Sequence, residues 1–222
     1  MTAPMPARSL LKALAGPLLM GAILFGASLY AFGGIDKLFK TTSPDVAACK
    51  AAQPLAAALK PLAKGEVAAL QIPKEPARLI DLSFKAPDGR DTTLSAFRGK
   101  AVLVNLWATW CAPCRHEMPA LDRLQQKFGG ADFEVVAINI DTRNFDKPKQ
   151  FLDEVGVRAL AQYADPSAKI FQDLKAAGRA FGMPTTILLD KNGCELATLA
   201  GPAEWSSPDA FAFIGKALGR AP

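Results

Sequence analysis

The sequence predicts a three-layer α/β domain with a mixed central sheet, preceded by one transmembrane helix. Two apolar runs, 101–107 and 133–140, have the continuous hydrophobic character of strands that are buried on both faces. Helical segments alternate with strand runs, and the chain closes with a β-hairpin and a last helix, a pattern typical of a sheet covered by helices. This pattern occupies residues 79–222, a length that suits a single hydrophobic core.

An uncharged apolar segment, residues 13–32, predicts the transmembrane helix. At 1.5 Å per residue it would span about 30 Å, the thickness of the hydrocarbon core of a bilayer. Arg8 and Lys12 precede it and no acidic residue does, so the positive-inside rule leaves residues 1–12 as a cytoplasmic stub and exports the rest. A cleaved signal peptide, with residues 31–33 as the cleavage site, is the alternative, but its apolar region would be unusually long. A buried core helix is the third interpretation and is disfavoured by the basic residues in front of it.

Residues 33–78 are expected to form a linker and a helical extension of the domain. The stretch 44–62 is rich in Ala and Leu, and Pro44 suits the first turn of a helix. Pro54 should divide that stretch into two short helices, because proline interrupts a helix interior. Residues 65–78 are expected to be irregular.

The elements expected after residue 79 follow from hydrophobic patterns and turn signals. They are hairpin strands at 79–84 and 92–94 around Pro87-Asp88-Gly89, buried strands at 101–107 and 133–140, helices at 111–128, 147–155, 168–177 and 208–218, a short strand at 160–164, and hairpin strands at 185–189 and 195–200 around Lys191-Asn192-Gly193.

Composition argues against several classes of function. The chain has 26 Lys and Arg against 21 Asp and Glu, with no basic run typical of nucleic-acid binding. One His and four Cys do not provide the ligand spacing of a structural zinc site. No glycine fingerprint for a nucleotide precedes a helix. We therefore expect no nucleic-acid partner, no bound metal and no cofactor.

The chemical centre of the sequence is Cys111-Ala112-Pro113-Cys114, at the junction of a buried strand and a helix. Free backbone N–H groups and the helix dipole stabilise a thiolate at this position. Cysteines three residues apart in one helical turn can also close a disulfide. A purely structural disulfide is disfavoured because it closes almost no loop, whereas a Cu(I) site that adds His116 and Met118 stays open as an alternative.

Four segments then carry a family resemblance: residues 104–119 (VNLWATWCAPCRHEMP), 136–141 (VAINID), 182–185 (GMPT) and 200–203 (AGPA). They resemble the thioredoxin-like family, and in particular the TlpA-like, membrane-anchored periplasmic thiol:disulfide interchange proteins. The resemblance implies dithiol–disulfide exchange with protein partners, with Cys111 as nucleophile and Cys114 as resolving thiol. It also implies a reducing role in the assembly of respiratory cytochromes.

The resemblance further implies a cis peptide bond between Met183 and Pro184, where the substrate backbone docks. Taken alone, Pro184 is as readily an ordinary proline at the start of a strand. The expected substrate-binding residues are Trp107, Trp110, Ala112, Pro113, Met183 and Pro184.

Two positions differ from thioredoxin and bear on the proton chemistry. Asn105 stands where thioredoxin carries a buried Asp, and an amide cannot accept the proton of the resolving thiol. Glu117 lies three residues after Cys114, on the same helical face. We take Glu117 as the candidate acid/base, as the resemblance implies; an ordinary surface Glu is the alternative. His116 is expected to be exposed and without a role.

Cys49 and Cys194 are the two remaining cysteines. In an exported protein, leftover cysteines usually pair. We expect a structural disulfide that ties the helical extension to the edge of the sheet; two free buried thiols are the alternative.

Together these features predict a single-pass inner-membrane protein with its catalytic domain in the periplasm. It would reduce client proteins that carry disulfides or metal-ligand cysteines, and would receive electrons from a membrane thiol-transfer protein. A monomer is expected. A Cu(I) metallochaperone that uses Cys111 and Cys114, an oxidising disulfide donor and a peroxidase are less favoured alternatives.

Overall fold

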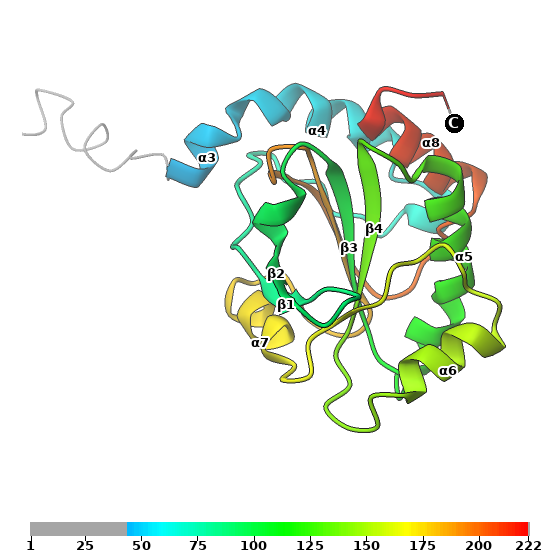
Figure 1. Ribbon diagram of the computed structural model, residues 1–222. Coiled ribbons are helices and arrows are strands. Elements are labelled where there is room, and N and C mark those ends of the chain that lie inside the picture. Colours follow the sequence, from blue (N-terminus) through cyan, green and yellow to red (C-terminus); the bar gives the residue numbers. More distant parts are fainter. Residues whose placement is uncertain (1–43, 222) are drawn as a thin grey trace, which may run out of the picture. The chain divides into compact units, whose positions relative to one another are not determined.

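A seven-stranded mixed sheet forms the centre of the structure, a computed structural model that describes residues 44–221 (Figure 1). The strand order is β2-β1-β5-β4-β3-β6-β7, in which β4 runs parallel to β3 and β5 and all other neighbours are antiparallel. The strands are β1 (Ser83–Lys85), β2 (Asp91–Thr93), β3 (Ala101–Trp107), β4 (Phe133–Asn139), β5 (Tyr163–Ala164), β6 (Thr185–Leu189) and β7 (Glu195–Ala200).

Helices cover both faces of this sheet (Figure 1). The main ones are α5 (Ala112–Phe128), α6 (Lys147–Glu154), α7 (Lys169–Ala176) and α8 (Pro208–Leu218). Helices α5 and α8 lie on one face, where Phe128 and Phe211 pack edge to face at 5.9 Å, and α7 lies on the other. The three-layer arrangement predicted from the sequence is confirmed for the described residues.

Strand β3 is the centre of the core because each of its residues is buried. It pairs with β4 on one side and with β6 on the other, so a continuous apolar sequence is what its position requires. The loop that leaves its C-terminal end leads directly into α5. The redox motif therefore lies at the start of the helix that follows a fully buried strand.

The amino-terminal extension contributes to the same core. It consists of α3 (Pro44–Ala48), α4 (Gln53–Leu59) and the short 3₁₀ turns Lys50–Ala52, Lys60–Leu62 and Gly65–Val67. Its Leu59 and Val67 are fully buried. Cys49 and Cys194 form a disulfide with a Cα–Cα distance of 5.6 Å, as predicted, which joins the extension to the start of β7.

Several boundaries differ from the sequence prediction. Pro54 lies in the first turn of α4, where a missing N–H is tolerated, and the helical stretch is interrupted earlier, at Cys49. The first hairpin strand begins only at Ser83, and β5 is reduced to two residues. The segment 65–78 is irregular as expected, but it forms one isolated bridge to Thr198 in β7 and one to Cys194, just before β7, which local sequence patterns do not reveal.

Within residues 44–221, no helix combines the length and the apolar character needed to cross a bilayer. The predicted anchor, residues 13–32, lies outside the described residues.

Candidate active site

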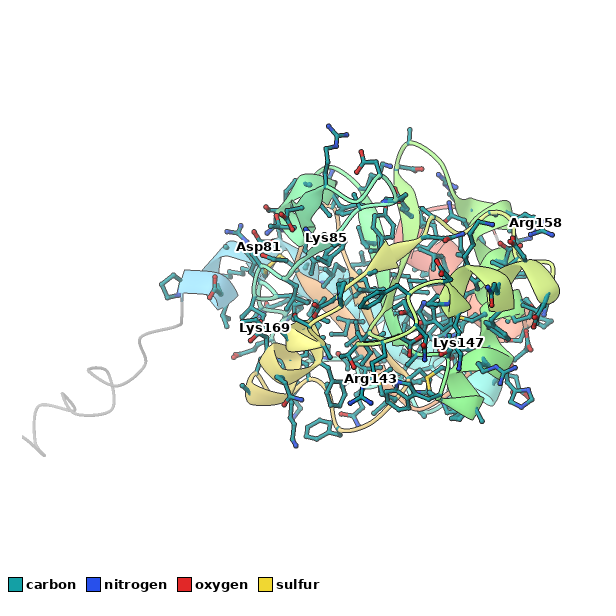
Figure 2. All side chains as sticks on the ribbon, turned by 60° about the horizontal axis from the view of Figure 1, so that its bottom comes forward. Asp81, Lys85, Arg143, Lys147, Arg158 and Lys169 are labelled. Atoms are coloured by element: carbon teal, nitrogen blue, oxygen red, sulfur yellow. A yellow bond between two sulfur atoms is a disulfide. The ribbon has the colours of Figure 1, made fainter. Side chains whose placement is uncertain are left out.

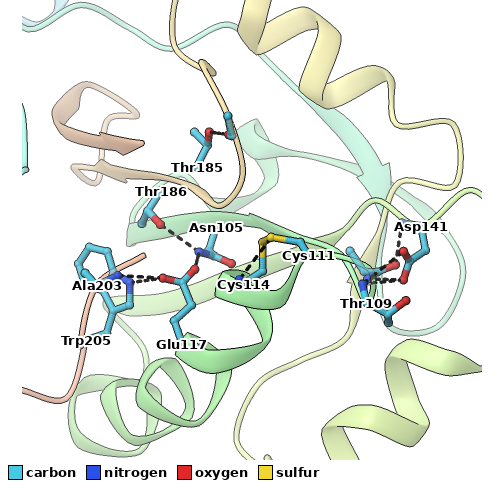
Figure 3. The surroundings of a disulfide bond; sticks show 12 residues. Asn105, Thr109, Cys111, Cys114, Glu117, Asp141, Thr185, Thr186, Ala203 and Trp205 are labelled. Carbon is cyan, nitrogen blue, oxygen red and sulfur yellow. Dashed lines mark hydrogen bonds between the residues drawn. A yellow bond between two sulfur atoms is a disulfide. The ribbon is translucent and has the colours of Figure 1, made fainter. Parts of the chain in front are cut away.

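Cys111 and Cys114 lie at the start of α5, where they form a disulfide with a Cα–Cα distance of 5.3 Å (Figure 3). Cys111 is the N-cap residue, and its sulfur accepts a hydrogen bond from the backbone N–H of Cys114 at 3.3 Å. This N–H and the positive end of the helix dipole stabilise negative charge on Cys111. Cys111 is 6% exposed and Cys114 is fully buried, so Cys111 is the more accessible residue of the pair.

A buried carboxylate holds the loop that carries the pair. Asp141, just beyond the end of β4, accepts hydrogen bonds from the backbone N–H of Thr109 at 3.1 Å and from the side-chain amide of Asn139 at 3.1 Å. Asp141 in turn donates its own N–H to the Asn139 side-chain oxygen. No role was predicted for Asp141 from the sequence. Its position could have suggested one, because Asp141 is a carboxylate just after β4, the buried strand that runs parallel to β3.

Glu117 is the second titratable group of the site, and it is 3% exposed. Its carboxylate accepts hydrogen bonds from the side-chain amide of Asn105 at 2.6 Å, from the indole N–H of Trp205 at 3.2 Å and from the backbone N–H of Ala203 at 3.3 Å (Figure 3). Burial raises the pKa of Glu117 to about 7, against the opposing effect of these hydrogen bonds. The alternative of an ordinary surface Glu is wrong.

Asn105 connects Glu117 to the central sheet. Its amide nitrogen also donates to the hydroxyl of Thr186 at 2.9 Å, while its own oxygen is buried without a hydrogen-bond partner among the described residues. Asn105, which cannot itself accept the proton of the resolving thiol, thus contacts the candidate acid/base directly. A carboxyl group with a pKa near 7 is suited to exchange protons with a thiol at neutral pH.

The predicted substrate-binding residues divide into two groups. Trp110 is 67% exposed, and Ala112 and Pro113 are exposed beside it. Trp107 is only 2% exposed and packs against Phe151 at 5.9 Å between ring centroids. The prediction that Trp107 belongs to the docking surface is therefore wrong. Trp107 is the last residue of β3, and its ring packs in the core.

The peptide bond between Met183 and Pro184 is cis, as predicted. Pairing of β3 with β6 places Leu106 opposite Thr185, so the bond lies at the end of the sheet from which the Cys111 loop departs. Met183 is partly exposed and Pro184 is buried. Met183 is thus the member of this pair that is open to a partner.

The two residues that a Cu(I) site would add to the cysteines, His116 and Met118, differ in their exposure. His116 is exposed, as expected, whereas Met118 is fully buried and packs in the core. A thioether in that position is not open to an ion bound at the protein surface.

The mixed sheet, the cysteine pair at the start of the helix after β3 and the cis proline define a protein of the thioredoxin-like class. The chain belongs to the Redoxin family, whose model matches residues 73–214.

Individual relatives carry names from the same chemistry. The thioredoxin-like protein YneN of Bacillus subtilis is 37% identical over 116 residues, which cover 51% of this chain and 64% of that protein. The thiol:disulfide interchange protein HelX of Rhodobacter capsulatus is 40% identical over 130 residues, or 56% of this chain and 64% of HelX. The match thus covers less than two thirds of each relative. A solved structure assigned as thiol:disulfide interchange protein DsbE, from Chlorobium tepidum, has 30% identity and a TM-score of 0.55, covering 64% of this chain and 96% of that one.

Proposed function

We propose that the protein is a thiol:disulfide oxidoreductase that reduces disulfides in other proteins through Cys111 and Cys114. The observation that carries the proposal is the asymmetry of the pair: Cys111, at a helix N-terminus, is 6% exposed, and Cys114 is fully buried. Such a pair separates the attacking thiol from the resolving thiol. The similarity to proteins named as thiol:disulfide interchange proteins supports the same chemistry.

The reaction takes place in two displacement steps. The Cys111 thiolate attacks one sulfur of the client disulfide, and the other client sulfur leaves as a thiolate that takes up a proton. Cys114 then loses its proton and attacks the Cys111 sulfur, which releases the second client thiolate. Two electrons pass to the client, and the pair ends as the Cys111–Cys114 disulfide. Glu117, one helical turn beyond Cys114, accepts the Cys114 proton in the second step.

The residues between the cysteines favour the reducing direction. Ala112 and Pro113 carry no charge or polar side-chain group that would further stabilise the Cys111 thiolate. A less stabilised thiolate makes the dithiol form a better electron donor, which is the property of reductants near about −270 mV rather than oxidants near about −120 mV.

We further propose that residues 13–32 anchor the protein in the inner membrane, with the catalytic domain in the periplasm as a monomer. The uncharged run and the basic residues before it support this orientation. Anchoring raises the local concentration of the domain near a membrane thiol-transfer protein, the proposed electron donor. The proposed clients are proteins of cytochrome or respiratory oxidase assembly, whose metal-ligand cysteines must be reduced before loading.

The first experiment is a redox titration of the Cys111–Cys114 pair in the full-length protein, with Cys49 and Cys194 intact. We expect a potential near that of thioredoxin, about −270 mV. The Cys114→Ser variant should then accumulate mixed disulfides with clients, and Cys111→Ser, the matched control, should not. A potential near about −120 mV would show that the protein donates disulfides rather than reduces them.

A further inference from the structure

A charged groove is bordered by Trp110 and Arg115, the residues immediately before and after the redox motif. Its volume is about 490 Å³, and it is bordered by the Thr109–Trp110 loop, the first turn of α5, the loop after β4 and one side of α6. Trp110, which borders it, immediately precedes the attacking Cys111. A chain segment next to a client's reactive cysteine would therefore reach this groove when the mixed disulfide forms.

Three cationic side chains border the groove: Arg115 from α5, Arg143 from the loop after β4, and Lys147 from α6. All three residues are exposed, and within residues 44–221 none takes part in a salt bridge or a side-chain hydrogen bond. Figure 2 shows Arg143 and Lys147 at the end of the domain that is at the bottom of Figure 1. Lys169, labelled in the same view, is instead paired with an acidic neighbour.

The acidic residues of the groove do not neutralise these cations. Asp141 is buried, and its oxygens are engaged by the Thr109 N–H and the Asn139 amide. Glu154 is exposed, but it ends α6 while Lys147 begins that helix, about 10 Å away along the axis. Among the residues that border the groove, the end near Arg143 and Lys147 is therefore the positive one. Arg143 lies two residues after Asp141, which holds the Cys111 loop, so this positive end is close to the redox pair.

The groove continues over an apolar surface. A second hollow of about 340 Å³ shares Arg115 and Phe151 with the first and extends between α5 and α6 to Pro119 and Val155. The guanidinium of Arg115 lies 4.6 Å from the centre of the Phe151 ring, which holds this cation at the junction of the two hollows. The two hollows together form a track suited to an extended segment with acidic side chains at one end and apolar ones beyond.

We infer that this groove binds an acidic segment that flanks the target cysteine of the client protein. The inference rests on the proposed function, because it assigns a substrate class to the same redox site. Opposite charges across such a surface accelerate encounter and select among partners more than they add affinity. The effect should therefore appear in the rate constant of the attack by Cys111, and it should weaken as salt screens the charges.

The test compares two disulfide-bonded peptides that differ only in having Glu or Gln beside the target cysteine. The reduced full-length protein is mixed with each peptide, and the second-order rate constant is measured at low and high ionic strength. We expect the wild type to favour the Glu peptide by on the order of tenfold at low ionic strength, with most of the preference lost in high salt. The Arg143→Glu/Lys147→Glu variant should lose or reverse that preference.

The matched control is Lys60→Glu/Lys175→Glu, which changes the net charge equally at exposed positions that do not border the groove. It should retain most of the preference. Equal rates of the wild type with both peptides, or equal losses in the two double variants, would overturn the inference while leaving the proposed function intact. Failure of the wild type to reduce either peptide would contradict the proposed function and the inference with it.

Discussion

Replacing Glu117 by Gln should change how the stability of the domain depends on pH. Glu117 is 3% exposed and burial raises its pKa from 4.5 to about 7. The folded state therefore binds more protons at this site than the unfolded state between these two values. The stability that the protonated form provides is fully present below pH 4.5 and is lost as the pH rises through 7.

The expected magnitude follows from the difference of about 2.5 pKa units. At 1.36 kcal/mol per unit, ionisation of Glu117 lowers the free energy of unfolding by about 3 kcal/mol above pH 7. A Gln side chain can keep the same hydrogen-bond partners once the Asn105 amide turns over, because in the wild type the Asn105 NH₂ donates to Glu117. Its oxygen can accept from Trp205 and Ala203, and its NH₂ can donate to the Asn105 oxygen, which has no partner among the described residues.

The assay is urea denaturation of the oxidised full-length protein at several pH values between 4 and 8.5. Glu117→Gln should have a free energy of unfolding close to that of the wild type at the acidic end and exceed it by up to about 3 kcal/mol at the alkaline end. Glu75→Gln, at an exposed Glu, is the control and should follow the wild type throughout. Parallel curves for the wild type and Glu117→Gln would refute the assignment of a raised pKa.

A kinetic measurement tests the proton-transfer role separately. The pH profile of the resolution step, in which Cys114 attacks the mixed disulfide, should show an inflection near pH 7 in the wild type. Glu117→Gln should lose that inflection and slow the step. An unchanged profile would reject Glu117 as the acid/base even if the stability result holds.

Two further predictions concern parts of the structure around the pair. Replacing both Cys49 and Cys194 by Ser should lower the free energy of unfolding by up to roughly 5 kcal/mol, because the disulfide closes a separation of 145 residues. Urea denaturation of the wild type and the double variant measures this difference. A loss below about 1 kcal/mol would contradict the entropic argument. Asp141→Ala should cost about 1–3 kcal/mol, since it leaves the Thr109 N–H and the Asn139 amide without their acceptor. It should also slow attack by Cys111, and a variant with wild-type stability and rate would show that this carboxylate does not hold the loop.

Much of the fold was predictable because its signals are local. The runs that became β3 and β4, the turns around Gly89 and Gly193, and the helix that Cys111 caps are each specified by residues close together in the sequence. β5 was less predictable. It has only two residues and is defined by pairing with β1 and β4 rather than by its own pattern.

The candidate site shows the same division. The sequence by itself determined the cysteine pair, its place at a helix start and the nomination of Glu117, since residue type and spacing along one helix carry that information. Only the tertiary structure decided that Glu117 is buried, because Ala203 and Trp205, which contact it, lie more than 80 residues further along the chain. It also decided that Trp107 lies inside the core, since apolar aromatic residues suit a buried strand end and an exposed loop equally well. The burial and the charge environment of a side chain depend on segments that are far away in the sequence, and these segments come together only when the chain has folded.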